Sequence, residues 1–311
     1  MLPRHIVVGT GMHADLAQAI RAARPDLDVR DKPDTAITAE DLAWADTFVG
    51  FRRPAVSTMG NVKWVHCTGA GVDAWLYPVE LPGEILLTRS SESFGPMIAE
   101  WALARALAFT QHLVELSQNQ RERRWVERDP TFIRGTRAVV AGTGDVGTNV
   151  ARLFRSLGSE VSGVSRSGRG DLDVFSRVDA VADLRTAVDG ADWLILTLPL
   201  TRETHGLVGR EVLSNCRGAV LINAGRGAVV VEREIPPALD AGWLRGAALD
   251  VFEIEPLPAT SPLWSDPRVM ISPHISGQTT VEGAAAGFLE CLVDFEAGRQ
   301  PRWIVDRRRG Y

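Results

Sequence analysis

Three ionisable side chains of the 311-residue chain each follow a stretch that reads as a short buried strand: Arg226, Glu255 and His274. Arg226 lies between two glycines that leave its guanidinium uncrowded, and arginine binds planar carboxylates through two parallel hydrogen bonds. Glu255 lies in a loop that the next residue, a proline, stiffens. In open α/β sheets, ligands bind at the carboxyl ends of strands, so this pattern indicates a site for a carboxylate-bearing ligand.

A glycine-rich turn follows the apolar stretch 138–141 and precedes a helical pattern that begins at Asp145 and Val146. Gly142 allows the tight turn, Gly144 lets backbone approach a pyrophosphate, and Gly147 lets the helix pack on the strand. The first turn of that helix offers unpaired N–H groups and a partial positive charge to phosphates. The pattern predicts a dinucleotide site. A looser glycine match at 9–14 has a histidine where phosphate would lie, and we interpret it as a turn.

The end of the next strand, 160–164, indicates which dinucleotide binds. NAD enzymes of this fold usually carry an acidic residue there, which accepts hydrogen bonds from the adenosine ribose. Here Ser165, Arg166 and Ser167 follow, and no carboxylate appears before Asp171. Hydroxyls and a guanidinium suit the 2′-phosphate of NADP, which a carboxylate would repel. We expect NADP(H) to be preferred. NAD(H) is the possible alternative, in which Arg166 would be a solvated side chain beside a permissive site.

A loop of small residues follows the apolar stretch 62–66. Within it, the backbone N–H groups of Ala70, Gly71 and Val72 could receive a substrate carboxylate. A plain turn is the alternative interpretation. His66, just before the loop, lies between apolar residues and reads as structural.

Two regions of alternating strand and helix patterns must position these residues. The first has strands at 5–8, 47–50 and 62–66 and a helix at 15–23. The second has strands at 138–141, 160–164, 191–198, 218–223, 246–249 and 269–271, which predicts a parallel, doubly wound sheet. Helical periodicity predicts one long helix over 96–125, which suits a connector and a subunit contact. A further helix, 280–297, is expected to return to the first domain.

The composition is that of an ordinary globular protein. Hydrophobic residues make up 45%, the mean hydropathy is -0.02 and the formal net charge is -5, which gives no reason to expect nucleic acid or an anionic membrane as partner. The three cysteines are widely spaced, so we expect a reducing compartment and no structural metal site. No signal peptide and no apolar run of about 18 residues is visible. A cytoplasmic location is expected.

Several of these segments, in this order, resemble the D-isomer-specific 2-hydroxyacid dehydrogenase family. They are the loop 68–73, the glycine turn, Leu-Pro-Leu-Thr at 198–201, Asn-Ala-Gly-Arg-Gly at 223–227, Leu-Asp-Val-Phe with Glu-x-Glu-Pro-Leu at 249–257, and Ser-Pro-His-Ile-Ser-Gly at 272–277. The resemblance spans nearly the whole chain. It implies an α/β protein with two Rossmann-like domains, each a doubly wound parallel sheet, an active-site cleft between them, and a homodimer.

The resemblance also implies the site. Residues 1–97 with 282–311 would form the flavodoxin-like substrate-binding domain, and residues 98–281 the dinucleotide-binding Rossmann domain. The catalytic set would be Arg226, Glu255 and His274, with Arg226 also a substrate contact beside Ala70, Gly71 and Val72. Asp250 would hold the nicotinamide carboxamide, a plain strand-end cap being the alternative. Further cofactor contacts are expected from Gly142, Gly144, Asp145, Val146, Gly147, Ser165, Arg166, Ser167, Leu198, Pro199, Thr204, Ala224, Gly225, Ser276 and Gly277.

These residue types fit the reduction of a 2-oxo acid. Protonated His274 can supply the proton as general acid, Glu255 would stabilise the protonated imidazole, and Arg226 can hold the carboxylate or polarise the carbonyl. Reduction would be favoured at lower pH and oxidation at higher pH. We expect an NADP(H)-preferring 2-oxo acid reductase, with glyoxylate or hydroxypyruvate as plausible substrates. A phosphoglycerate dehydrogenase-like enzyme using NAD, or a non-catalytic nicotinamide-sensing protein like the related corepressors, is the alternative.

Overall fold

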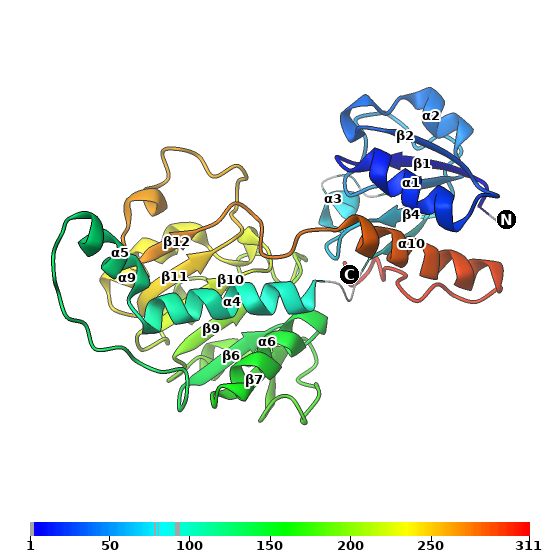
Figure 1. The fold of residues 1–311 in the computed structure, drawn as a ribbon. Coiled ribbons are helices and arrows are strands. Elements are labelled where there is room, and N and C mark those ends of the chain that lie inside the picture. The colour runs from blue at the N-terminus through cyan, green and yellow to red at the C-terminus, as the bar shows by residue number, and fades with distance from the viewer. Residues whose placement is uncertain (1–2, 78, 80, 91–93) are drawn as a thin grey trace. The chain divides into compact units, whose positions relative to one another are not determined.

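A computed structural model describes residues 3–77, 79, 81–90 and 94–311. The chain divides into two compact units, residues 1–93 with 278–311 and residues 94–277. Each unit contains one parallel sheet flanked by helices (Figure 1). The expected α/β fold class with two parallel sheets is thus confirmed.

Unit 1 has five parallel strands in the order β2-β1-β3-β4-β5, the order of flavodoxin-like sheets. Its strands are β1 His5–Gly9, β2 Asp28–Lys32, β3 Thr47–Val49, β4 Trp64–Cys67 and β5 Leu86–Arg89. Its helices are α1 His13–Ala23, α2 Ala39–Trp44, α3 Asp73–Leu76 and α10 Val281–Glu296. One buried cluster includes Val65, Trp75 and Leu87, and another joins β1 to α1 and α10. The C-terminal helix therefore belongs to the core of the first unit.

Unit 2 has seven parallel strands in the order β12-β11-β10-β9-β6-β7-β8. Its strands are β6 Arg137–Ala141, β7 Glu160–Ser165, β8 Val178–Ala180, β9 Trp193–Leu196, β10 Ala219–Asn223, β11 Leu244–Leu249 and β12 Val269–Ile271. Its helices are α4 Gly95–Thr110, α5 Leu113–Arg121, α6 Asp145–Ser156, α7 Leu184–Ala187, α8 Arg210–Leu213 and α9 Ile235–Asp240. Helices α4 and α6 lie side by side against the sheet (Figure 1).

The prediction of a single long helix over 96–125 is wrong. Helix α4 ends at Thr110, His112 has φ +51°, and α5 ends at Arg121. The returning chain explains the break, because the Gln111 side chain donates to the Thr131 carbonyl at 3.1 Å and His112 Nε2 lies 3.2 Å from the Asp129 carbonyl. Apolar periodicity continues through the break, which is why the sequence does not reveal it.

The boundaries between the two units also differ slightly from those expected. Unit 2 begins at Phe94 rather than residue 98, and the chain re-enters unit 1 at Gln278 rather than 282. The first turn of α4 already packs on α6, since a Cβ at Gly95 would meet the Asn149 side chain. The start of α4 therefore belongs to unit 2.

Candidate functional site

Most of the predicted site residues lie at one edge of the seven-stranded sheet. Because all its strands are parallel, the segments that follow β6, β7, β9, β10, β11 and β12 meet at this carboxyl edge. Strands β7 and β8 extend to one side of β6, and β9 to β12 to the other side. The strand order therefore reverses at β6, and ligands of open α/β sheets bind at such a switch point.

The glycine turn between β6 and α6 is tight and has open space in front of it. Gly142 has φ +106°, and a Cβ at Gly147 would collide with the Gly142 carbonyl oxygen. These two glycines therefore permit the turn and the close approach of helix to strand. A Cβ at Gly144 would meet no atom within 4 Å, so the space in front of it is open. Helix α6 begins here with Asp145, Val146 and Gly147, whose N–H groups precede the first intrahelical bond.

The turn after β7 uses its serine internally. The Ser165 hydroxyl donates to the Arg169 carbonyl at 2.8 Å and accepts from the Arg169 N–H at 3.1 Å. The hydroxyl thus closes the turn both as a donor and as an acceptor. Gly168, at φ +67°, lies in the same turn. Arg166 and Ser167 are exposed on this turn.

Arg226 lies in a turn that packs against the segment carrying Glu255. A Cβ at Gly227 would collide with the backbone carbonyl of Phe252, so only glycine allows this approach. The Asn223 side chain donates to the Arg226 carbonyl at 3.2 Å and accepts from the Gly225 N–H at 3.1 Å. The half-buried guanidinium also acts electrostatically on Glu255, lowering the pKa of that carboxyl.

His274 and Glu255 form a hydrogen-bonded pair. His274 Nδ1 lies 2.8 Å from Glu255 Oε2, and Glu255 Oε1 accepts the Phe252 N–H at 3.0 Å. The side chains are 39% and 35% exposed, so a small substrate could reach them. Burial raises the pKa of Glu255, but the hydrogen bonds from His274 and Phe252 outweigh it, and the net pKa lies below its ordinary value. Glu255 is therefore an anion at neutral pH.

Asp250 holds the loop that carries His274. Its carboxylate is fully buried and accepts the Ser272 hydroxyl at 2.6 Å, the Ile275 N–H at 3.0 Å and the Ser276 N–H at 2.7 Å. Its carbonyl accepts the His274 N–H at 2.8 Å, and His274 itself has φ +54°. These contacts favour the strand-end cap among the two roles that the sequence left open.

The remaining residues predicted to contact the cofactor are mostly buried or packed within unit 2. Gly225 lies against Leu198, since a Cβ there would meet the Leu198 carbonyl oxygen at 2.7 Å. Thr204 is buried and donates to the Pro199 carbonyl at 2.6 Å, which orders the loop after β9. Ala224 and Ser276 are buried, and Gly277 packs under Ile98 of α4.

In unit 1, the loop after β4 carries the residues predicted to bind substrate. In the part of the chain that the structure describes, the N–H groups of Ala70, Gly71 and Val72 donate to no protein acceptor. The Ala70 carbonyl accepts from Arg89 Nη1 at 2.6 Å. The loop thus presents donors that an anion could use.

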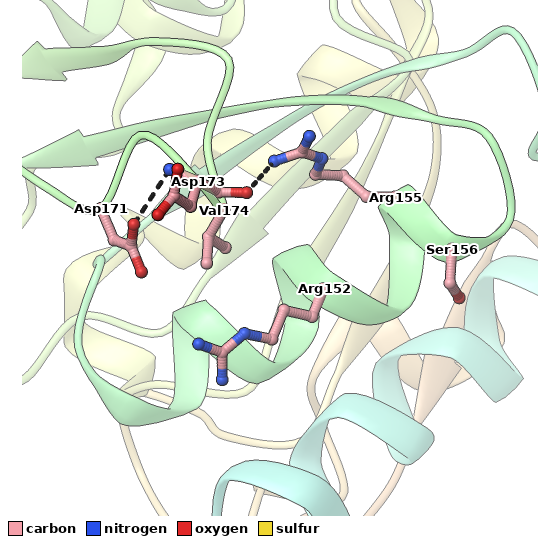
Figure 2. Close-up of a pocket in the computed structure, with 6 residues that line it drawn as sticks. All are labelled: Arg152, Arg155, Ser156, Asp171, Asp173 and Val174. Atoms are coloured by element: carbon pink, nitrogen blue, oxygen red, sulfur yellow. Dashed lines mark hydrogen bonds between the residues drawn. The ribbon is translucent and has the colours of Figure 1, made fainter.

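A cavity of about 450 Å³ lies elsewhere, beside α6. Figure 2 shows Arg152 and Arg155 reaching from α6 toward the loop after β7, where Arg155 donates to the Asp173 carbonyl at 2.6 Å. Two arginines and two aspartates balance their charges in its lining, which consists of Arg152, Arg155, Ser156, Asp171, Asp173 and Val174. Among the described residues, no helix is long and apolar enough to span a bilayer, and no three His, Cys, Asp or Glu side chains gather as metal ligands would.

Comparison with known proteins identifies the family. Residues 103–276 match the D-isomer specific 2-hydroxyacid dehydrogenase, NAD binding domain. The chain belongs to the D-isomer specific 2-hydroxyacid dehydrogenase family. A relative, glyoxylate/hydroxypyruvate reductase A of Serratia proteamaculans, is 33% identical over 276 residues, 86% of this chain and 88% of that protein.

Two solved structures resemble this dehydrogenase over almost its full length. One is a D-isomer specific 2-hydroxyacid dehydrogenase from Xanthobacter autotrophicus in complex with NADPH and MES, with TM-score 0.88 and 32% identity over 99% of this chain and 100% of that one. The other is the NADPH-dependent glyoxylate/hydroxypyruvate reductase from Sinorhizobium meliloti with NADP and sulfate, with TM-score 0.86 and 28% identity over 98% and 99%. The dehydrogenase is an NAD(P)-dependent oxidoreductase.

Three residues that shape the site were not predicted. Ser272 and Trp101 join the His274 loop to α4, because the Trp101 indole donates to the Ser272 hydroxyl at 3.2 Å and that hydroxyl donates to Asp250. Arg89 contacts the loop after β4 through the Ala70 carbonyl. Ser272 lies two residues before the histidine and could have been suspected. Trp101 and Arg89 carry no sequence signal that links them to the site.

Proposed function

We propose that this dehydrogenase is an NADP(H)-preferring 2-oxo acid reductase whose catalytic residues are Arg226, Glu255 and His274. The observation that carries the proposal is the 2.8 Å hydrogen bond between His274 Nδ1 and Glu255 Oε2, at the sheet edge that also holds the glycine turn. A histidine paired to a carboxylate through one nitrogen keeps the other nitrogen for proton transfer.

The proton follows a simple route. Glu255 accepts a hydrogen bond from the protonated Nδ1 and stabilises the imidazolium, while His274 Nε2 donates its proton to the substrate's keto oxygen during reduction. In the reverse direction, neutral His274 removes the hydroxyl proton. Bound NADPH supplies the hydride that completes the reduction of ketone to alcohol. Low pH therefore favours reduction, and high pH favours oxidation.

Arg226 would bind the anionic end of the substrate. Its guanidinium offers paired donors that suit a carboxylate, and the turn around it is rigid because Gly227 contacts Phe252. Polarising the keto oxygen would also lower the barrier to hydride addition. On unit 1, the N–H groups of Ala70, Gly71 and Val72, which meet no acceptor among the described residues, would receive the carboxylate. We propose glyoxylate and hydroxypyruvate as substrates, because relatives named for these activities cover most of the chain.

The glycine turn and the β7 turn would hold NADP(H). Gly142, Gly144 and Gly147 fit a pyrophosphate, and Arg166 with Ser167 would bind the 2′-phosphate. The exposed positions of Arg166 and Ser167 and the NADPH found in the Xanthobacter relative support this choice. Ser165 would act indirectly, by closing the turn that presents its neighbours. Arg166→Asp should weaken NADPH binding far more than NADH binding, and equal effects on both would contradict the assignment.

A homodimer is also proposed. Large apolar side chains are exposed along one consecutive stretch of unit 2, where a second copy could cover them: Leu107, Leu113, Val114, Leu116, Trp125 and Phe132. Sedimentation of the purified protein tests this directly, and a monomer at micromolar concentration would contradict it.

One variant tests the catalytic assignment. His274→Ala should retain NADPH affinity, since the glycine turn is untouched, while kcat falls by about 10²–10⁴-fold, the usual contribution of a general acid. Titration of NADPH fluorescence and steady-state turnover give the two readouts. A variant that keeps most of its kcat would refute the role. Tight cofactor binding by wild type without turnover of any 2-oxo acid would favour the nicotinamide-sensing alternative.

A further inference from the structure

Arg89 lies beside the loop that the proposed function assigns to the substrate carboxylate. It ends β5 and pairs in register with Cys67, the last residue of β4, so the loop begins at the next residue. Its backbone is fixed on two sides. The Arg89 N–H donates to the Trp303 carbonyl at 3.1 Å, and the Ser90 N–H donates to the Cys67 carbonyl at 2.8 Å. The side chain therefore projects from a rigid strand end.

The contact between Arg89 and the loop fixes one peptide plane. Arg89 Nη1 donates to the Ala70 carbonyl at 2.6 Å. In a planar trans peptide the C=O and the following N–H point in opposite directions, so the Gly71 N–H points away from Arg89. Within the described residues, that N–H and those of Ala70 and Val72 donate to no protein acceptor. Arg89 thus occupies the Ala70 carbonyl, so that the loop presents its N–H donors to an anion.

The charge of Arg89 adds to this effect. The guanidinium is half-buried, and burial lowers its pKa from the ordinary value, yet arginine stays protonated in proteins. Cys67 and Tyr311 act on the guanidinium electrostatically and raise its pKa, against the larger effect of burial. A half-buried positive charge raises the local potential and attracts anionic ligands.

We infer that Arg89 is a positioning residue that orients the 68–72 loop for the substrate carboxylate and adds a positive charge behind it. This inference rests on the proposed function. It goes beyond the assigned loop contacts, because it makes binding of the carboxylate depend on a side chain of β5. Loss of Arg89 should impair substrate binding more than the chemical step, since proton transfer belongs to His274.

Arg89→Gln and Arg89→Lys test the inference in the full-length protein. Arg89→Gln removes a charge-assisted hydrogen bond to the loop and a positive charge, so it should raise KM for glyoxylate at least about tenfold. Its kcat should stay within about threefold of wild type. Arg89→Lys, which keeps the charge, should fall between. Calorimetric titration with oxalate, which has two carboxylates and no ketone to reduce, should show the same order of affinities in the presence of NADP.

Arg21→Gln is the matched control. Arg21 is another arginine of unit 1 that donates to a backbone carbonyl, that of Val29 at 2.8 Å, away from this loop. The control should keep wild-type KM and oxalate affinity, and all variants should keep NADPH affinity. Arg89→Gln with KM and oxalate affinity within twofold of wild type overturns the inference, as does a parallel loss of NADPH affinity and thermal stability. Wild type that binds oxalate but reduces no 2-oxo acid contradicts the proposed function instead, and the oxalate titrations still decide the role of Arg89.

Discussion

A buried histidine should make the stability of the protein depend on pH. His66 lies on β4 with no exposed surface, and its ring nitrogens are 2.8 Å from the Thr88 hydroxyl and 3.1 Å from the Ser90 hydroxyl. Burial lowers the pKa of His66 from 6.5 to about 3. His66 is therefore neutral in the native protein across the physiological range.

The sign and size of the effect follow from proton linkage. In the unfolded chain His66 takes up a proton below about pH 6.5, while the folded protein resists it until about pH 3. Stability is thus fully present above pH 6.5 and is lost as the pH falls. Between pH 8 and pH 5 the linkage relation gives a loss of about 2 kcal/mol from this group, because the unfolded state alone binds the proton.

Urea denaturation followed by circular dichroism measures the effect. Wild type should lose about 2 kcal/mol more unfolding free energy between pH 8 and pH 5 than His66→Gln, whose amide can still bond the two hydroxyls but does not titrate. His205→Gln, at an exposed histidine, should behave like wild type. Equal losses in wild type and His66→Gln would refute the reasoning, because His66 would then titrate alike in both states.

Three further substitutions probe the site. Glu255→Gln should lower kcat for reduction about tenfold or more, because the amide cannot stabilise the protonated His274. A kcat equal to that of wild type argues against the dyad. Asp250→Asn should lower the unfolding free energy by about 1.5–3 kcal/mol and reduce kcat, since one amide oxygen cannot accept all three loop hydrogen bonds. Urea denaturation and steady-state turnover measure the two effects. Wild-type values for both would contradict the role of Asp250 in holding the His274 loop. Gly147→Ala should abolish NADPH binding, because its Cβ collides with the Gly142 carbonyl oxygen. Wild-type NADPH affinity in a fluorescence titration would contradict the close packing of α6 on the glycine turn.

Much of the fold could be predicted because buried parallel strands read as apolar runs. All six strands predicted in the second region appear, with small shifts at their ends. Strands β2, β5 and β8 were not predicted. Strand β2, Asp-Val-Arg-Asp-Lys, is mostly polar, and β8, Val-Asp-Ala, contains no apolar run. The break at His112 also escaped, since it depends on hydrogen bonds from a chain segment about twenty residues away.

The candidate site likewise contains residues that could be predicted from the sequence and contacts that could not. Arg226, Glu255 and His274 could be selected because their types and their places after strands indicate chemistry before any contact is known. The internal use of the Ser165 hydroxyl and the hold of Asp250 on the His274 loop could not, because each depends on which backbone groups fold back within reach. Arg89 belongs to this second class, since only the pairing of β4 with β5 brings it to the loop.

The most direct test of the proposed function is a steady-state assay with a panel of 2-oxo acids, including glyoxylate and hydroxypyruvate, run in parallel with NADPH and NADH. The proposal predicts oxidation of NADPH with at least one of these two substrates, at a kcat/KM well above that with NADH and rising toward lower pH. Tight binding of NADPH without turnover of any 2-oxo acid would contradict it.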